Sequence, residues 1–156
     1  MKYKIPPFLL IISSKLIENY LQGENGTAII EFLTNLAVCQ NVVPDPDENG
    51  EIVYKAQSPD EAALCDGARK NGFAFTTRTQ TEVTVDVRGE KQTFQVLNVL
   101  GFSSKRARMT VVVRHPDGTI RAYSKGSDAK MVPLLSDSIY FFFPFFFLPE
   151  NIYRRN

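Results

Sequence analysis

The stretch from Leu97 to Asp128 carries the clearest strand pattern in the chain. Apolar residues cluster at Val96–Leu100, recur at Met109–Val113, and alternate with polar residues over Thr119–Lys125. Short runs rich in branched apolar residues are typical of strands in a sheet. The residues His115–Gly118 have hairpin chemistry, because proline fixes its own φ and glycine tolerates positive φ. The pattern therefore predicts three strands, the last two joined by a hairpin.

A helical pattern precedes this region, between Gly26 and Gln40. Its apolar residues recur three and four positions apart, at Ile29, Phe32, Leu33, Leu36 and Ala37. This spacing predicts an amphipathic helix that packs through one face. Pro44–Gly50 is predicted as a turn-rich loop that cannot continue the helix, and Glu51–Ala56 as a strand.

A second helix is predicted from Ser58 onward, because this segment has the residues that start a helix. Ser58 suits the N-cap, Pro59 suits the first helical position, and Glu61 completes a capping box. Asp60 and Glu61 also favour the positive end of the helix dipole, and Asn71-Gly72 supplies the stop. The two adjacent carboxylates point in different directions, so they are not predicted to form an acid–base pair.

Bulk composition fits one folded domain. The chain has 156 residues, 44% of them apolar, which is enough for one hydrophobic core. The net charge is +1, from 18 basic and 17 acidic side chains, so charge gives no reason to expect a nucleic-acid or acidic-membrane partner. The predicted fold class is α+β, an antiparallel sheet flanked by helices.

Cysteine and histidine are too few for a metal site. The chain holds Cys39, Cys65 and one histidine, His115, which do not form the paired pattern of a zinc site. We therefore predict no metal ligands, and two buried free thiols in a protein from a reducing compartment.

The two ends of the chain differ from its middle. Phe8–Ile12 follows two lysines as in a signal peptide, but five apolar residues are too few, so residues 1–25 are predicted as a cytosolic N-terminal segment. Residues 136–156 form an atypical tail, with six Phe within Ser138–Pro149. That run is too short to span a bilayer, and Pro144 interrupts it. An interfacial membrane anchor and low-complexity sequence at a truncated end are both consistent with it.

One corner of the predicted hairpin has residues suited to a ligand. Lys125 is expected across the hairpin from Arg106 and Arg108, which makes a corner that suits a phosphate. Gly126 leaves room for a ligand to approach the backbone. Phe102 has two interpretations. It could offer a stacking face for a planar base, but the pattern alone favours a place in the core.

Four segments share their order and spacing with the motifs of a known family. They are EFLTNLAVCQNVVP at Glu31–Pro44, YKAQSPDEAAL at Tyr54–Leu64, LNVLGFSSKRARMTVVVR at Leu97–Arg114 and YSKGSD at Tyr123–Asp128. Together they resemble the nucleotide-binding domain of type-IV P-type ATPases, the phospholipid flippases. The resemblance covers roughly Gly26–Leu135, so residues 26–135 are expected to be a partial ATP-binding domain, incomplete on its C-terminal side.

The resemblance implies a domain that holds ATP and delivers its γ-phosphate to a separate phosphorylation domain. Within that family pattern, Phe102 would stack on adenine and Glu61 would approach the adenine edge. Lys125 and Gly126 would line the pocket.

The same resemblance implies a supporting role for two residues and also shows departures from the family. Ser103 and Arg108 would support the lip formed by the aromatic ring. Ala107 stands where the family usually has lysine, so a phosphate contact is missing unless a neighbouring arginine substitutes. Gly101 replaces a common acidic residue, and Ser127 replaces the alanine of the Lys-Gly-Ala-Asp motif.

The chain contains no Asp-Lys-Thr-Gly-Thr segment, so no catalytic phosphoacceptor is expected in it. In the complete pump, the resemblance implies ATP with Mg²⁺, a phospholipid substrate and a transmembrane accessory subunit. That pump would be a membrane protein with this domain on the cytosolic side, and the fragment alone is expected to be cytosolic. The alternative is a truncated non-catalytic module that binds a protein or a membrane surface through an exposed sheet edge. Nucleic-acid binding ranks third.

Overall fold

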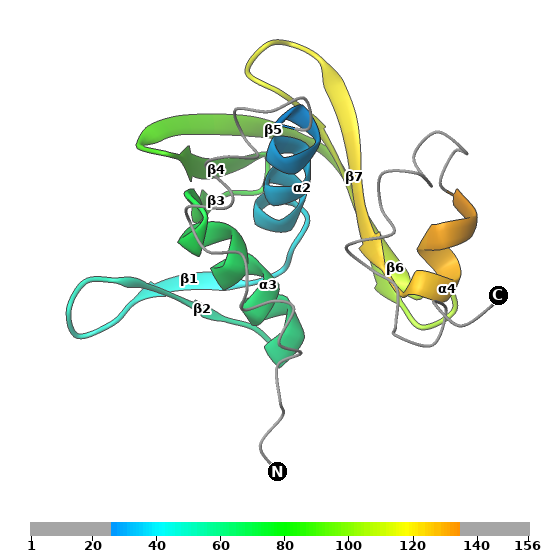
Figure 1. Cartoon of the computed structure of the whole chain (residues 1–156), viewed down its shortest axis with the longest axis horizontal. Helices are drawn as coiled ribbons and strands as arrows, with labels where there is room; N and C mark the ends of the chain where they lie inside the picture. Colours follow the sequence, from blue (N-terminus) through cyan, green and yellow to red (C-terminus); the bar gives the residue numbers. More distant parts are fainter. Residues whose placement is uncertain (1–25, 135–156) are drawn as a thin grey trace, which may run out of the picture.

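A five-stranded antiparallel sheet forms the frame of the structure, a computed structural model that describes residues 26–134. Its strands lie in the order β3-β4-β5-β6-β7, and β1 and β2 form a separate two-stranded sheet (Figure 1). The elements in chain order are α2 (Gly26–Val38), β1 (Val43–Pro46), β2 (Ile52–Lys55), α3 (Pro59–Lys70), β3 (Phe73–Arg78), β4 (Glu82–Val87), β5 (Glu90–Ser103), β6 (Arg108–Arg114), β7 (Ile120–Gly126), α4 (Asp128–Met131) and η2 (Val132–Leu134). Sequential strands are therefore neighbours throughout the larger sheet.

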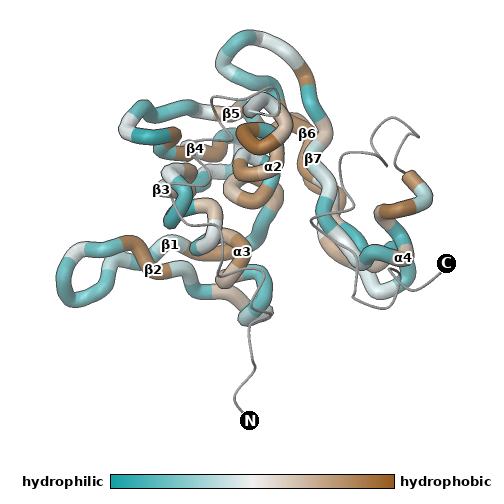
Figure 2. Tube along the Cα trace, in the orientation of Figure 1, coloured by the Kyte–Doolittle hydropathy of each residue, from teal (hydrophilic) through white to brown (hydrophobic). Residues whose placement is uncertain are grey.

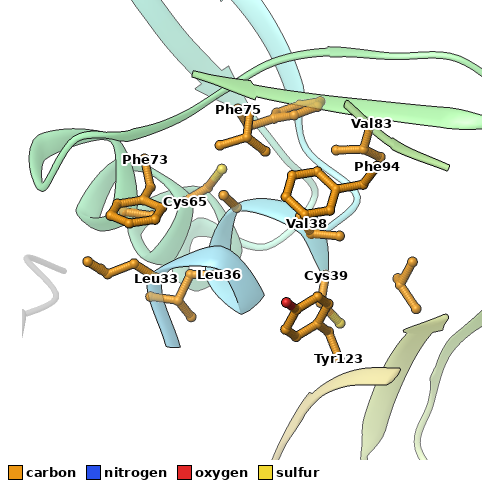
Figure 3. Packing of buried hydrophobic residues seen from close by; sticks show 14 of the residues in the cluster. Leu33, Leu36, Val38, Cys39, Cys65, Phe73, Phe75, Val83, Phe94 and Tyr123 are labelled. Atoms are coloured by element: carbon orange, nitrogen blue, oxygen red, sulfur yellow. The ribbon is translucent and has the colours of Figure 1, made fainter. Parts of the chain in front are cut away.

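The core lies between one face of the larger sheet and the helices α2 and α3. Alternate strand residues are buried on that face, as the period of two in a strand requires. Its fully buried members include Phe73, Phe75, Val83, Val85, Phe94, Val111 and Val113. Figure 3 shows Leu33 and Leu36 from α2 meeting the aromatic rings of the sheet. Figure 2 shows the same division along the chain, with apolar residues in α2 and polar residues at the tip of the β1–β2 hairpin. Burying each large apolar side chain contributes about 1.5–3 kcal/mol.

The predicted α+β class, an antiparallel sheet flanked by helices, is confirmed. The predicted first helix is also confirmed, although it ends at Val38, two residues before the expected Gln40. The predicted hairpin joins β6 to β7, where the His115 amide donates to the Thr119 carbonyl at 2.8 Å. Gly118 in this turn has a φ of +84°, the conformation for which glycine was expected.

The prediction of a loop over Pro44–Gly50 is wrong in part, because most of β1 lies within it. In β1, Asp45 is the Cα partner of Val53 in β2. Prolines are tolerated in this strand because it has β2 as its one sheet neighbour, so a missing amide donor can face away from the pairing. The sequence interpretation also left β3 and β4 unassigned, and β5 begins at Glu90, well before the predicted run from Val96.

The start of α3 lies where it was predicted, but its cap differs. Ser58 is the N-cap residue and Pro59 begins the helix. The Ser58 side chain makes no capping hydrogen bond, and the Glu61 carboxylate accepts instead from the Asn41 amide at 3.1 Å. The predicted capping box is therefore wrong, because a tertiary contact takes the glutamate away from the helix end. Gly72, with a φ of +86°, follows the end of the helix as predicted.

The second half of β5 has an open edge. Its first half, Glu90–Gln95, pairs with β4, whereas its second half pairs with β6 on the other side. The Val96 amide still donates to the Thr81 carbonyl at 2.7 Å, but beyond this point the β4 side of β5 has no paired strand among residues 26–134. Bulges after Val96 and Leu100 interrupt the pairing with β6. The exposed apolar residues along this half are Leu97, Val99, Leu100 and Phe102.

A polar network joins α2 to the β6–β7 hairpin. The Tyr123 hydroxyl donates to Glu31 Oε2 at 2.9 Å and lies 2.6 Å from His115 Nε2. Because the single hydroxyl proton goes to the carboxylate, His115 donates from Nε2. Arg121 also pairs with Glu31, and the Phe94 ring packs edge-on to the imidazole at 4.8 Å between centroids. Burial, helped by the nearby Arg121 charge, lowers the pKa of His115 below its ordinary value.

The two cysteines are free and buried, as predicted. Burial raises the pKa of the Cys39 thiol to about 11 and that of Cys65 to about 12. Both thiols therefore stay protonated near neutral pH and serve as core side chains.

Replacing His115 by glutamine is expected to flatten the pH dependence of stability between about pH 7.5 and about pH 5.5. Because the folded state holds the imidazolium poorly, the native protein loses stability as pH falls through the unfolded-state pKa of about 6.5. Glutamine keeps an N–H donor for Tyr123 but does not titrate. Denaturant unfolding at both pH values measures the effect. If the free energy of unfolding falls by the same amount between the two pH values in the unchanged chain and in the variant, groups other than His115 cause the pH dependence.

Candidate functional site

Glu61 and Lys125 form an ion pair between α3 and β7. Lys125 Nζ lies 3.1 Å from Glu61 Oε1, and each side chain is 17% exposed. The ammonium nitrogen is enclosed and makes no hydrogen bond of good geometry with a described residue, so the contact is an ion pair with donors to spare. Two residues predicted for one pocket therefore meet in the structure.

The fold itself fixes the positions of Glu61 and Lys125, without a ligand. Lys125 is the Cα partner of the buried Met109, so its side chain leaves β7 on the core face of the sheet. Glu61 lies in the first turn of α3, where its Oε1 atom accepts the Asn41 amide as well as facing the ammonium group. One carboxylate oxygen is thus engaged twice, which leaves Oε2 for another donor.

Phe102 is 62% exposed, so the interpretation of this ring as a core residue is wrong. It lies on the half of β5 that extends past β4, where β6 pairs on one side and no described strand pairs on the other. Ser103 is the Cα partner of Arg108, so these two share one face. Phe102 precedes Ser103 at a bulge, where the register of β5 with β6 shifts between Leu100 and Ser103. Because β6 lies between β5 and β7, two strand spacings, roughly 10 Å, separate the strand of Phe102 from the strand of Lys125.

The face of the sheet opposite to Lys125 carries three other predicted residues, Gly126, Arg108 and Ser103. Gly126 is the Cα partner of Arg108. A Cβ atom at position 126 would lie 2.5 Å from the Arg108 Cβ and 2.5 Å from the Ala107 carbonyl oxygen. Glycine is therefore required by the close approach of the two chain segments, whatever ligand binds in front of them. Arg108 and Ser103 support β5 and β6 from the opposite face.

The turn that follows Phe102 is closed on itself. Arg106 Nε donates to Ser103 Oγ at 3.1 Å, and the same guanidinium bonds the Gly101 carbonyl. Ala107 has a φ of +47°, and its carbonyl accepts the Ser127 amide at 2.9 Å. The expected corner of Lys125 with Arg106 and Arg108 therefore does not form. Arg108 pairs with Gly126 and leaves from the face opposite to Lys125, and Arg106 turns back toward β5.

Sequence reasoning missed the residues that hold the pair in place. Arg78 donates to the Gln40 carbonyl at 2.6 Å and so fixes the chain that presents the Asn41 amide. Asn35 Nδ2 donates to the Ser124 carbonyl at 3.0 Å, immediately before the lysine in β7. These contacts join residues far apart in the chain, so no local pattern signals them.

The family model described as P-type ATPase, cytoplasmic domain N, matches residues 28–139. The chain belongs to this family. Its match covers α2 from its third residue, all the later helices, both sheets and every residue of the candidate site.

Curated relatives agree with the family assignment. The chain is 44% identical over 113 residues to phospholipid-transporting ATPase IC of Xenopus tropicalis, covering 72% of this chain and 9% of that protein. It is 44% identical over 117 residues to phospholipid-transporting ATPase tat-1 of Caenorhabditis elegans, covering 74% and 10%. It is 42% identical over 126 residues to phospholipid-transporting ATPase ID of Mus musculus, covering 81% and 10%. The chain therefore spans about a tenth of the length of these relatives.

Two features are absent from the part of the P-type ATPase chain that the structure describes. Within residues 26–134, no group of three or more His, Cys, Asp or Glu side chains is arranged to hold a metal ion. No helix of that same part combines the length and the apolar character needed to cross a bilayer.

Replacing Gly126 by alanine is expected to destabilise the domain by about 1–3 kcal/mol, because the added methyl group would meet the backbone and Cβ of the facing strand. Gly101→Ala is the matched control, since nothing lies within 4 Å of its added Cβ. We expect the control to change stability by no more than about 0.5 kcal/mol. Denaturant unfolding measures both. Similar losses for the two variants would contradict the close-approach argument.

Proposed function

We propose that this chain is the ATP-binding portion of a P-type ATPase that translocates phospholipids across a membrane. The observation that supports this most is the enclosed Glu61–Lys125 pair, together with the exposed Phe102 ring two strands away in the same sheet. The family assignment and the names of the relatives support the same function.

The proposed site has the chemistry to hold a purine. An exposed aromatic ring offers a stacking surface, and base–aromatic stacking contributes about 1–3 kcal/mol per base. Lys125 has spare N–H donors, and Glu61 has a free acceptor in Oε2. A donor and an acceptor side by side match the adenine edge, which presents a ring nitrogen and an amino group. Phe102 would thus stack on adenine while Glu61 and Lys125 read its edge.

The remaining predicted residues shape the pocket without reading the base. Gly126 lines it through its backbone, since a side chain there would collide with the neighbouring strand. Ser103 and Arg108 support the aromatic lip from the opposite face of the sheet. The proposal therefore keeps all six predicted residues but divides them between contact and support.

In the complete pump, ATP held here would pass its γ-phosphate to an aspartate in another part of the polypeptide, because this chain contains no Asp-Lys-Thr-Gly-Thr segment. Mg²⁺ would act there with the phosphates. The phospholipid substrate and a transmembrane accessory subunit would belong to other parts of that assembly. The pump would be a membrane protein with this domain on the cytosolic side.

The open edge of β5 favours a second candidate function, a non-catalytic module that binds a protein or a membrane surface. This edge carries four exposed apolar side chains and no charged residue between Leu97 and Phe102. Unpaired strand edges of this kind accept further strands. Nucleotide binding separates the two functions, because a module of this kind has no need of an enclosed ion pair below an aromatic ring.

Replacing Phe102 by alanine is expected to weaken ATP binding about tenfold or more, from the loss of stacking. The exposed ring contributes little to the core, so the fold should persist. Lys125→Ala is a poorer test, because it would leave the Glu61 carboxylate enclosed without its counter-ion. Calorimetric titration of the full chain with ATP measures the effect.

Ile120→Ala is the matched control for that titration, because Ile120 is 57% exposed and lies at the far end of the hairpin. It should bind ATP like the unchanged chain. Equal affinities of the Phe102 variant and the control would remove the stacking assignment. Absence of ATP binding in the unchanged chain would count against the proposed function itself.

A further inference from the structure

The cationic side chains around the proposed pocket decide what the triphosphate of a bound nucleotide would meet. In the turn after Phe102, at the start of β6 and at the end of β7 they are Lys105, Arg106, Arg108 and Lys125. Their number suggests strong attraction of the phosphates, but this attraction depends on which of the four charges is free and faces the ligand.

The Arg106 side chain is already hydrogen-bonded within its own turn. Its Nε atom donates to Ser103 Oγ at 3.1 Å, and its guanidinium also bonds the Gly101 carbonyl. Both acceptors belong to the end of β5, so the side chain folds back along its own turn. To contact a phosphate, this arginine would have to give up hydrogen bonds that close the loop after Phe102.

Arg108 faces away from the pocket. It is the Cα partner of Gly126, and the space that a Cβ of Gly126 would fill lies 2.5 Å from the Arg108 Cβ. These two positions therefore share one face of the sheet. Lys125, one residue earlier in β7, leaves from the other face. The Arg108 side chain thus leaves the sheet from the face opposite to the Glu61–Lys125 pair.

Lys125 faces the pocket, but its charge is neutralised there. Its ammonium group lies 3.1 Å from Glu61 Oε1, inside a site where both side chains are 17% exposed. The pair therefore adds no net charge to the site. Such a pair distinguishes bases by their polar edges, and it adds little to the attraction of a distant phosphate.

Lys105 is the remaining cation, and it lies exposed in the turn. At physiological salt, charges on exposed side chains are screened over about 8 Å, and single exposed pairs contribute at most about 1 kcal/mol. The next loop position that could carry a charge is Ala107, which is neutral. The run Lys105-Arg106-Ala107-Arg108 therefore leaves the phosphates with little to bind.

We infer that this site recognises the adenine base and draws little affinity from the phosphates, so that adenosine, AMP, ADP and ATP bind with comparable strength. The inference rests on the proposed function, because it concerns the same pocket. Its structural basis is that Arg106 is bonded to its own turn, Arg108 faces the other side of the sheet, and Lys125 is paired with Glu61. The site is thus an adenine-nucleoside site within a nucleotide-binding fold.

Titration of the full chain with the four ligands tests this inference. Calorimetry in about 150 mM salt with a chelator of divalent cations is expected to give dissociation constants within about threefold of one another. ATP binding tenfold or more tighter than adenosine would overturn the inference while leaving the proposed function intact. Failure of all four ligands to bind would overturn the proposed function and this inference with it.

Ala107→Lys supplies the charge that the loop lacks. Because Ala107 already has a φ of +47°, lysine there adds no new backbone strain beyond that of alanine. We expect ATP affinity to rise roughly three- to tenfold and adenosine affinity to stay unchanged. Ala122→Lys, at an exposed position in the middle of β7, adds the same charge away from the lip and should change neither. No gain for ATP, or an equal gain for adenosine, would contradict the role given to Ala107.

Discussion

The ion pair between Glu61 and Lys125 joins the first turn of α3 to the last residues of β7. In the proposed function, the same pair would also supply the polar groups that contact the base. Two charges removed from water are tolerable because each compensates the other, so neither can be changed alone without cost. The Asn41 amide fixes the carboxylate from a third segment. In the proposed function, ligand recognition and the cohesion of the fold would depend on the same ion pair.

Much of the fold follows from local pattern. The stripe of α2, the turn before β7 and the residues that open and close α3 each have a nearby physical cause, and the structure agrees with them. The exceptions are instructive. Pro44 and Pro46 suggest a loop until β2 is known to pair with that segment. Likewise, the capping box at Ser58 fails because the fold brings Asn41 within reach of the same glutamate.

The candidate site was harder to predict from pattern alone. Alternation along β5 gives no sign that Phe102 is exposed, because exposure depends on where β4 ends rather than on the neighbouring residues. The pattern offered a stacking role for this ring but favoured the core, and the resemblance to flippase motifs favoured the stacking role and added Glu61. The supporting contacts of Arg78 and Asn35 reach across 38 and 89 residues, so neither a motif nor a period could reveal them.

The incomplete pairing of β5 has a mechanical consequence for its aromatic ring. Any chain segment that paired with the open edge of β5 between Leu97 and Ser103 would lie beside Phe102. Bulges on either side of Val99 and Leu100 give this stretch more freedom to bend than the fully paired strands have. The orientation of the ring is therefore open to control from outside the pocket, by whatever borders the sheet.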